Sequence, residues 1–250
     1  MKKIIVAGDS HTRSFALRKN LIPVFLGPGK EINLSSHNLH KVEKKLKQLI
    51  KKIKNIDYDL FLFLGEPNVR YQLEKGWYPF KDKTTQSVVN HKYLKECADN
   101  YVKLAQSFNA KLITPTSAYN KSVKGLKYFN KYLCSVNNVN VIDVFSKTIK
   151  SEKVREEFLF ENLIEDPIHL NMKIADVFFE VLSQNSDKHR IFENHQKIIK
   201  PYLNEKNLKD IFKENRFGTL TLDDSNLINK ISKKLLNSIY DQKINNQFEN

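Results

Sequence analysis

The sequence predicts an α/β protein built on a doubly wound parallel sheet of five strands with helices on both faces. Short runs of β-branched and apolar residues alternate along the chain with longer segments of helical periodicity, which is typical of a parallel sheet. The run at 59–64 is apolar at every position after the first, as a central strand covered on both faces requires. Sheets of this kind carry their sites at the carboxyl ends of the strands.

The expected elements follow one another in a regular order. Apolar runs predict strands at 4–7, 22–26, 59–64, 111–115 and 139–144. The remaining periodic segments predict helices at 14–19, 37–53, 93–108 and 174–182. In the helix at 37–53 the apolar residues recur at helical spacing, and the lysines fall on the opposite, solvated face.

The length of 250 residues suits one main domain with an addition. We place the domain at 1–183 and a small helical appendage at 184–250, where asparagine becomes frequent and the charge is mixed. Helical periodicity is visible at 198–212 and 227–239, and we expect a frayed end after residue 240. The appendage carries no recognisable chemistry and is a candidate surface for homo-oligomerisation.

The net charge of +14 is weak evidence for a nucleic-acid partner. Only six of the 42 basic residues are arginine, whereas bidentate recognition of phosphates and bases favours arginine. The lysine excess, beside many asparagines and isoleucines, is typical of an AT-rich coding sequence. We therefore predict no nucleic-acid partner. No phosphate-binding glycine loop, dinucleotide fingerprint or metal-ligating cluster appears, so the sequence predicts neither a cofactor nor a metal.

Several observations predict a cytoplasmic protein without a membrane span. No run of eighteen apolar residues occurs. The apolar run near the start is only about four residues long and leads directly into a turn, which is typical of a core strand rather than a signal peptide. The two cysteines, Cys97 and Cys134, form no disulfide framework, and we expect both to be small buried hydrophobic residues.

The first strand ends in Gly8-Asp9-Ser10-His11, and this turn is the first candidate for chemistry. Gly8 permits a tight turn, and the amides that open a following helix can bind an oxyanion. Ser10 is therefore a candidate nucleophile. The alternative is that Asp9 or Ser10 merely caps the helix.

A second motif, Asp166-Pro167-Ile168-His169, lies just before the last predicted helix of the domain. A nucleophilic serine needs a base that takes its proton and a carboxylate that holds this base in the right tautomer. One Asp-x-x-His loop supplies both groups.

Together the two motifs resemble those of the SGNH (GDSL-like) hydrolase superfamily, and the resemblance covers residues 1–183. It implies a flavodoxin-like three-layer fold. It also implies that Ser10 is the nucleophile, His169 the general base and Asp166 the carboxylate that orients His169.

The resemblance also implies an oxyanion hole built from the Ser10 amide, a glycine amide after the second strand and an asparagine side chain. Gly27 or Gly29 fits the second position, although an ordinary Pro-Gly turn fits these residues equally well. The third strand runs into Gly65-Glu66-Pro67-Asn68-Val69-Arg70, where the superfamily has Gly-x-Asn-Asp. Asparagine is thus displaced by one position, and we expect the Asn68 amide to be the third donor.

This third motif is closer to a bacterial branch, often linked to surface-polysaccharide loci, that carries Gly-Asp-Ser-His and Gly-Glu-x-Asp-x-Arg. Glu66 and Arg70 are four residues apart, so they can pair if a helix begins here; the plain alternative is a surface ion pair of little energetic value. We expect contacts to substrate from His11, Arg70, Trp77, Tyr78 and Tyr119. The aromatic cluster around Trp77 suits a lid or a platform for a sugar ring, and equally a satellite core beneath its own loop.

The resemblance therefore implies a serine esterase or acyl hydrolase acting on an acyl ester, with the branch favouring an acetyl ester of a carbohydrate. The same site becomes an O-acyltransferase if a sugar hydroxyl replaces water. The alternative from another class is a non-catalytic module of the same fold that binds a glycan or a protein. Retention of all three triad residue types favours the enzyme.

Overall fold

The computed structural model describes residues 2–15, 21–55, 57–72, 90–159, 168, 170 and 173–182. Within them, five strands form one parallel sheet in the order β2-β1-β3-β4-β5. The strands are β1 (Lys3–Gly8), β2 (Leu21–Phe25), β3 (Tyr58–Phe63), β4 (Lys111–Ile113) and β5 (Val141–Ile142). The prediction of a five-stranded parallel α/β sheet is confirmed, and this strand order is that of flavodoxin-like folds.

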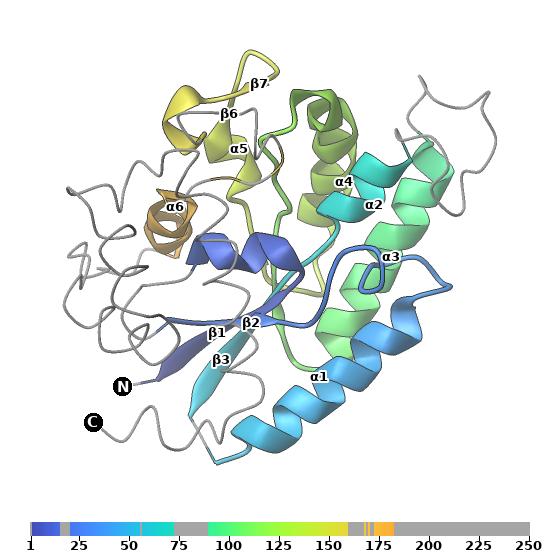
Figure 1. Ribbon diagram of the computed structural model, residues 1–250, viewed down its shortest axis with the longest axis vertical. Coiled ribbons are helices and arrows are strands. Elements are labelled where there is room, and N and C mark those ends of the chain that lie inside the picture. The colour runs from blue at the N-terminus through green and yellow to red at the C-terminus, as the bar shows by residue number, and fades with distance from the viewer. Residues whose placement is uncertain are drawn as a thin grey trace, which may run out of the picture.

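Helices cover both faces of the sheet (Figure 1). One face carries α1, α3 and α4, and the other carries the short 3₁₀ helix η1 and α6 (Figure 1). The bounds are η1 (Ser10–Phe15), α1 (Leu39–Ile53), α2 (Glu66–Tyr71), α3 (His91–Ser107), α4 (Val123–Ser135), α5 (Phe145–Thr148) and α6 (Lys173–Val181). Of the described helices, none is long and apolar enough to cross a membrane.

The direction of strand succession reverses at β1, which pairs with β2 on one side and with β3 on the other. At the end of β1, Gly8 lies opposite Phe25 of β2 and Phe63 of β3. Because all three strands are parallel, the turns that follow them emerge at the same edge of the sheet. In open α/β sheets this reversal point is where ligands bind.

An aromatic cluster fastens η1 and α6 to the sheet. Phe15 of η1 packs edge-to-face on Phe63 at 5.2 Å and on Phe178 of α6 at 5.4 Å, measured between ring centroids. Phe178 also packs on Phe61 of β3 at 5.0 Å. Edge-to-face contacts at these distances are favourable beyond the burial of area alone. The short helix η1, which begins with Ser10, is therefore held against the core by its last residue, Phe15.

On the opposite face, Tyr101 of α3 closes the gap between the ends of β3 and β4. Its single hydroxyl proton is shared between the carbonyl oxygens of Leu62 and Ile113, and the hydroxyl oxygen accepts from the backbone N–H of Leu64 at 3.0 Å. These are backbone groups at the carboxyl ends of the strands, and burial without a partner would cost free energy. One side chain thus satisfies the backbone of two strands at the edge where the site lies.

Helix α4 and a hairpin are among the described elements that the sequence did not predict, besides α5 and two short 3₁₀ helices at Asn120–Ser122 and Glu156–Phe158. Helix α4 contains Gly125, which weakens a helical pattern, yet a Cβ at this position would lie 2.6 Å from Cγ1 of Val69. The glycine is thus explained by close packing of α4 on α2. The hairpin consists of β6 (Ile149–Lys150) and β7 (Lys153–Val154).

Three expectations differ from the structure or lie outside it. Cys97 is buried, but Cys134 is exposed because it lies on the solvent side of α4, so the expectation for Cys134 was wrong. The strand predicted at 139–144 is reduced to β5. The appendage at 184–250 lies outside the described residues.

Candidate functional site

The turn after β1 has no space for a side chain at its glycine. A Cβ on Gly8 would lie 2.0 Å from the carbonyl oxygen of Phe63 on the neighbouring strand. The next residue, Asp9, organises η1: its Oδ1 accepts from the backbone N–H of His11 at 2.9 Å, and its carbonyl oxygen accepts from the N–H of Thr12 at 3.1 Å. Asp9 thus caps η1. Ser10 is the first residue of this short helix.

Asp9 is also an electrostatically unusual residue. It is 1 % exposed, and among the residues that the structure describes its Oδ2 has no hydrogen-bond partner. Burial raises the pKa of Asp9 from 3.8 to about 6. The proximity of His11 and Arg70 opposes this rise, and the Glu66 carboxylate adds to it. Ionisable groups with displaced pKa values gather at functional sites more often than elsewhere.

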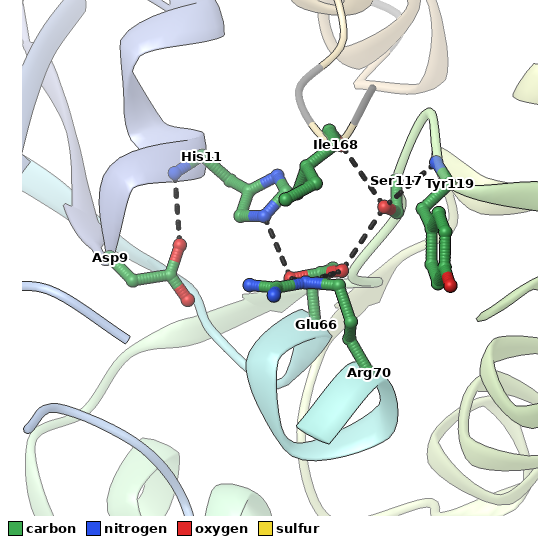
Figure 2. Close-up of polar contacts among 7 residues, drawn as sticks. All are labelled: Asp9, His11, Glu66, Arg70, Ser117, Tyr119 and Ile168. Atoms are coloured by element: carbon green, nitrogen blue, oxygen red, sulfur yellow. Dashed lines mark hydrogen bonds and ion pairs between the residues drawn. The ribbon is translucent and has the colours of Figure 1, made fainter. Parts of the chain in front are cut away.

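Glu66 lies at the centre of the polar contacts at this edge (Figure 2). It is the first residue of α2 and is 1 % exposed. Its carboxylate accepts from His11 Nε2 at 2.9 Å, from Arg70 Nε at 3.0 Å and from Ser117 Oγ at 3.1 Å. The pairing of Glu66 with Arg70 was expected from their spacing. The burial of this pair was not expected from the sequence. Because Glu66 is buried, the pair is not a surface ion pair.

Ser117 connects Glu66 to a distant part of the chain (Figure 2). Its Oγ lies 3.0 Å from the carbonyl oxygen of Ile168 and accepts from the backbone N–H of Tyr119 at 3.1 Å. The N–H of Ala118 donates to the same Ile168 carbonyl oxygen at 2.9 Å. The segment after β4 therefore binds the backbone immediately before position 169.

The backbone immediately after position 169 is bound by η1. Ser14 Oγ donates to the carbonyl oxygen of Leu170 at 2.8 Å, and both groups are buried. Asp166 and His169 themselves lie outside the described residues, as do Trp77 and Tyr78. The two chain neighbours of His169 are thus anchored at this edge, one of them to the helix that begins with Ser10.

Both candidate oxyanion glycines belong to a loop that packs tightly. Gly27 has φ of +147°, and a Cβ there would lie 2.6 Å from Cγ1 of Ile32. A Cβ on Gly29 would lie 2.4 Å from Cγ of Pro67 in α2. The loop after β2 therefore lies against the beginning of α2, close to Glu66. Whether either N–H binds an oxyanion stays a prediction.

The Asn68 amide does not have the surroundings expected of an oxyanion donor. Asn68 is 1 % exposed, and its Oδ1 accepts from the backbone N–H of Leu34 at 3.0 Å. Its Nδ2 donates to Tyr93 Oη at 3.0 Å and to Cys97 Sγ at 3.4 Å. Both donors and the acceptor are therefore used inside the protein, where they join α2 to α3 and to the loop before α1. At its place after Pro67, the Asn68 side chain therefore holds neighbouring elements together within the described structure.

Of the residues expected to contact substrate, the structure brings His11 and Arg70 together on Glu66, and Tyr119 contributes a backbone N–H beside them. The sequence predicted no functional role for Glu66 or Ser14, and for Ser117 only a place at the carboxyl edge of the sheet with a contact to substrate. Glu66 had a visible signal, an acid in a glycine motif four residues before an arginine. In the part of the chain that the structure describes, histidine, cysteine and acidic side chains form no cluster able to hold a metal ion.

No protein-family model matches this sequence, and no curated protein matches it. A solved structure of a GDSL-like lipase from Bacteroides thetaiotaomicron is similar at 12 % sequence identity and a TM-score of 0.42, covering 73 % of this chain and 86 % of that one. At this identity and TM-score the similarity assigns no activity to the chain.

Proposed function

We propose that the protein is a serine hydrolase of esters in which Ser10 is the nucleophile, His169 the general base and Asp166 the carboxylate that orients His169. The observation that carries the proposal is the anchoring of Ile168 and Leu170, the two neighbours of His169, at the edge where β1 delivers Ser10. Leu170 is bound by Ser14, four residues after Ser10 on the same short helix. The described neighbours of His169 are thus bound by the short helix that begins with Ser10 and by the segment after β4, which supports the proposal.

The proposed reaction follows from these roles. Ser10 Oγ attacks the ester carbonyl carbon while His169 takes the serine proton, and the oxyanion is bound by the Ser10 N–H and by the N–H of Gly27 or Gly29. His169 then gives the proton to the leaving alcohol, which departs and leaves an acyl-enzyme. Water activated by His169 releases the acid, and a sugar hydroxyl in place of water would make the enzyme an O-acyltransferase.

The substrate that we propose is an acyl ester, in particular an acetyl ester, of a carbohydrate. This finer proposal rests on the resemblance of the Gly-Asp-Ser-His and Gly-Glu-x-x-x-Arg motifs. Trp77 and Tyr78 are proposed as a stacking surface for a sugar ring.

The buried charges favour an enzyme over a binding module of the same fold. Asp9, His11, Glu66 and Arg70 gather at the end of β1 and β3, and Asp9 has a displaced pKa. Removing such groups from water is unfavourable in free energy, and a surface that only binds a partner does not require buried ionisable groups.

A fluorophosphonate probe tests the proposal, because it reacts with activated serines. Wild-type protein should be labelled at Ser10, and Ser10→Ala should abolish both labelling and turnover of a short acyl ester while the fold stays intact. Asp166→Asn should leave a smaller residual rate, since the carboxylate orients the base rather than reacting.

Ser146→Ala is the matched control, because Ser146 is an exposed serine on α5 outside the site. It should be labelled as wild type. Folded wild-type protein that is not labelled, or labelling that survives Ser10→Ala, contradicts the proposal, and the first of these results favours the binding module.

A further inference from the structure

We propose that Glu66 is a positioning residue that aligns the nucleophile with the general base; this inference rests on the proposed function. The Glu66 carboxylate binds the imidazole of His11, which directly follows Ser10. Through Ser117 it also reaches the carbonyl oxygen of Ile168, which directly precedes His169. Glu66 is thus one hydrogen bond from the neighbour of the nucleophile and two from the neighbour of the base.

The chemistry of a carboxylate fits this position. Its two oxygens accept from three side chains at 2.9–3.1 Å, and Arg70 Nε also lies 3.3 Å from the second oxygen. A carboxylate offers about four lone-pair sites and no donor, so it can accept from all three side chains at once. An amide of the same shape would turn an N–H₂ group toward N–H or O–H donors on one side. Glutamine at this position should therefore release part of the network.

Ser117 lies between Glu66 and the backbone of Ile168 and contacts both. Its hydroxyl faces Glu66 Oε1 and the Ile168 carbonyl oxygen, while the N–H of Tyr119 donates to it. Three contacts leave the hydroxyl little freedom. Arg70, held by the same carboxylate from within α2, keeps Glu66 in its orientation. The single hydroxyl proton of Ser117 is shared between Glu66 Oε1 and the Ile168 carbonyl oxygen, so a chain of polar contacts runs from η1 through Glu66 and Ser117 to Ile168.

The expected effect is on rate, because misplacement of a reacting group by about 1 Å costs roughly a hundredfold. We would measure kcat and KM for a short acyl ester in Glu66→Gln, Ser117→Ala and the double variant. Glu66→Gln should lower kcat about a hundredfold and Ser117→Ala about tenfold, with KM within about twofold of wild type. Because both act along one chain of contacts, the double variant should be no slower than Glu66→Gln alone.

Thr116→Val is the matched control for Ser117→Ala. Thr116 is the preceding residue, is buried, and uses its hydroxyl in a 3.0 Å hydrogen bond to Thr148 Oγ1. The variant loses a buried hydroxyl of the same segment without touching Glu66 or Ile168. Its kcat, normalised to folded protein, should stay within about twofold of wild type.

The inference is overturned if Ser117→Ala and Glu66→Gln match Thr116→Val in kcat, or if the two losses multiply in the double variant. If Glu66→Gln does not fold, the comparison of kcat between Ser117→Ala and Thr116→Val decides whether the inference holds. Fluorophosphonate labelling separates this result from failure of the proposed function. Labelled Ser10 with unchanged kcat in the variants overturns only the positioning role, whereas unlabelled wild-type protein overturns both.

Discussion

The carboxyl group of Asp9 is buried, and its Oδ2 is shielded from water. Because burial raises the pKa of Asp9 from 3.8 to about 6, the native state binds more protons than the unfolded state between these values. The free energy of unfolding contributed by Asp9 is therefore highest below pH 3.8, and it is lost as the pH rises through about 6. At neutral pH the ionised Asp9 carboxylate thus makes the protein less stable than a protonated, uncharged carboxyl group at this position would.

Asp9→Asn should remove this pH dependence. Relative to wild type, the free energy of unfolding of the variant should rise by about 2 kcal/mol between about pH 4.5 and about pH 7.5. Urea denaturation at the two pH values measures the difference. Asp57→Asn, at an exposed aspartate, controls for the loss of a negative charge. Parallel stability profiles for wild type and Asp9→Asn would contradict the assignment.

Asn68 should matter for stability and little for rate. Asn68→Ala leaves the buried N–H of Leu34 without its acceptor and removes the hydrogen bond to Tyr93 Oη, which should cost about 2 kcal/mol or more in the free energy of unfolding. The fluorophosphonate labelling rate per folded molecule should change by less than about threefold. A loss of roughly a hundredfold with unchanged stability would instead identify Asn68 as an oxyanion donor.

At the scale of the element, local pattern predicted some features well. β3 and α1 were predictable because their apolar spacing is visible within one element. The turn at Ser10 was predictable because Gly8 and the polar residues after it follow a strand directly. The burial of Glu66 was not, since it depends on Ser117, which lies 51 residues away. The partners of Asn68 also come from other elements, so motif position alone could not predict them.

Helix α2 begins at a backbone position that glycine alone adopts easily. Gly65 has φ of +113°, and a Cβ there would lie 3.1 Å from Cε1 of Phe129. Gly65→Ala should therefore cost about 1–3 kcal/mol in the free energy of unfolding. It should also slow labelling of Ser10, because Glu66 is the next residue. Thermal unfolding and the labelling rate measure both effects, and a variant with the wild-type Tm would show that the backbone relaxes without strain.

At the scale of the whole molecule, strands and helices of the described residues pack on one apolar core, from Ile4 of β1 to Phe179 of α6. The change in composition after residue 183 predicts a domain boundary there. We therefore expect a chain ending at residue 183 to fold and to be labelled by the fluorophosphonate. Circular dichroism should show a cooperative thermal transition. A fragment that is unfolded would contradict the domain boundary and would give residues 184–250 a part in the core.

The hydrogen bond between Ser14 and Leu170 joins groups 156 residues apart, so it also orders events in time. At ribosomal speeds the chain between them takes roughly ten to thirty seconds to synthesise. Throughout that interval the growing polypeptide already carries Ser10 but has no partner for Ser14 at position 170. Under the proposed function, an unfinished chain holds the proposed nucleophile, Ser10, without its proposed base, and the site is completed only when synthesis of the domain is nearly over.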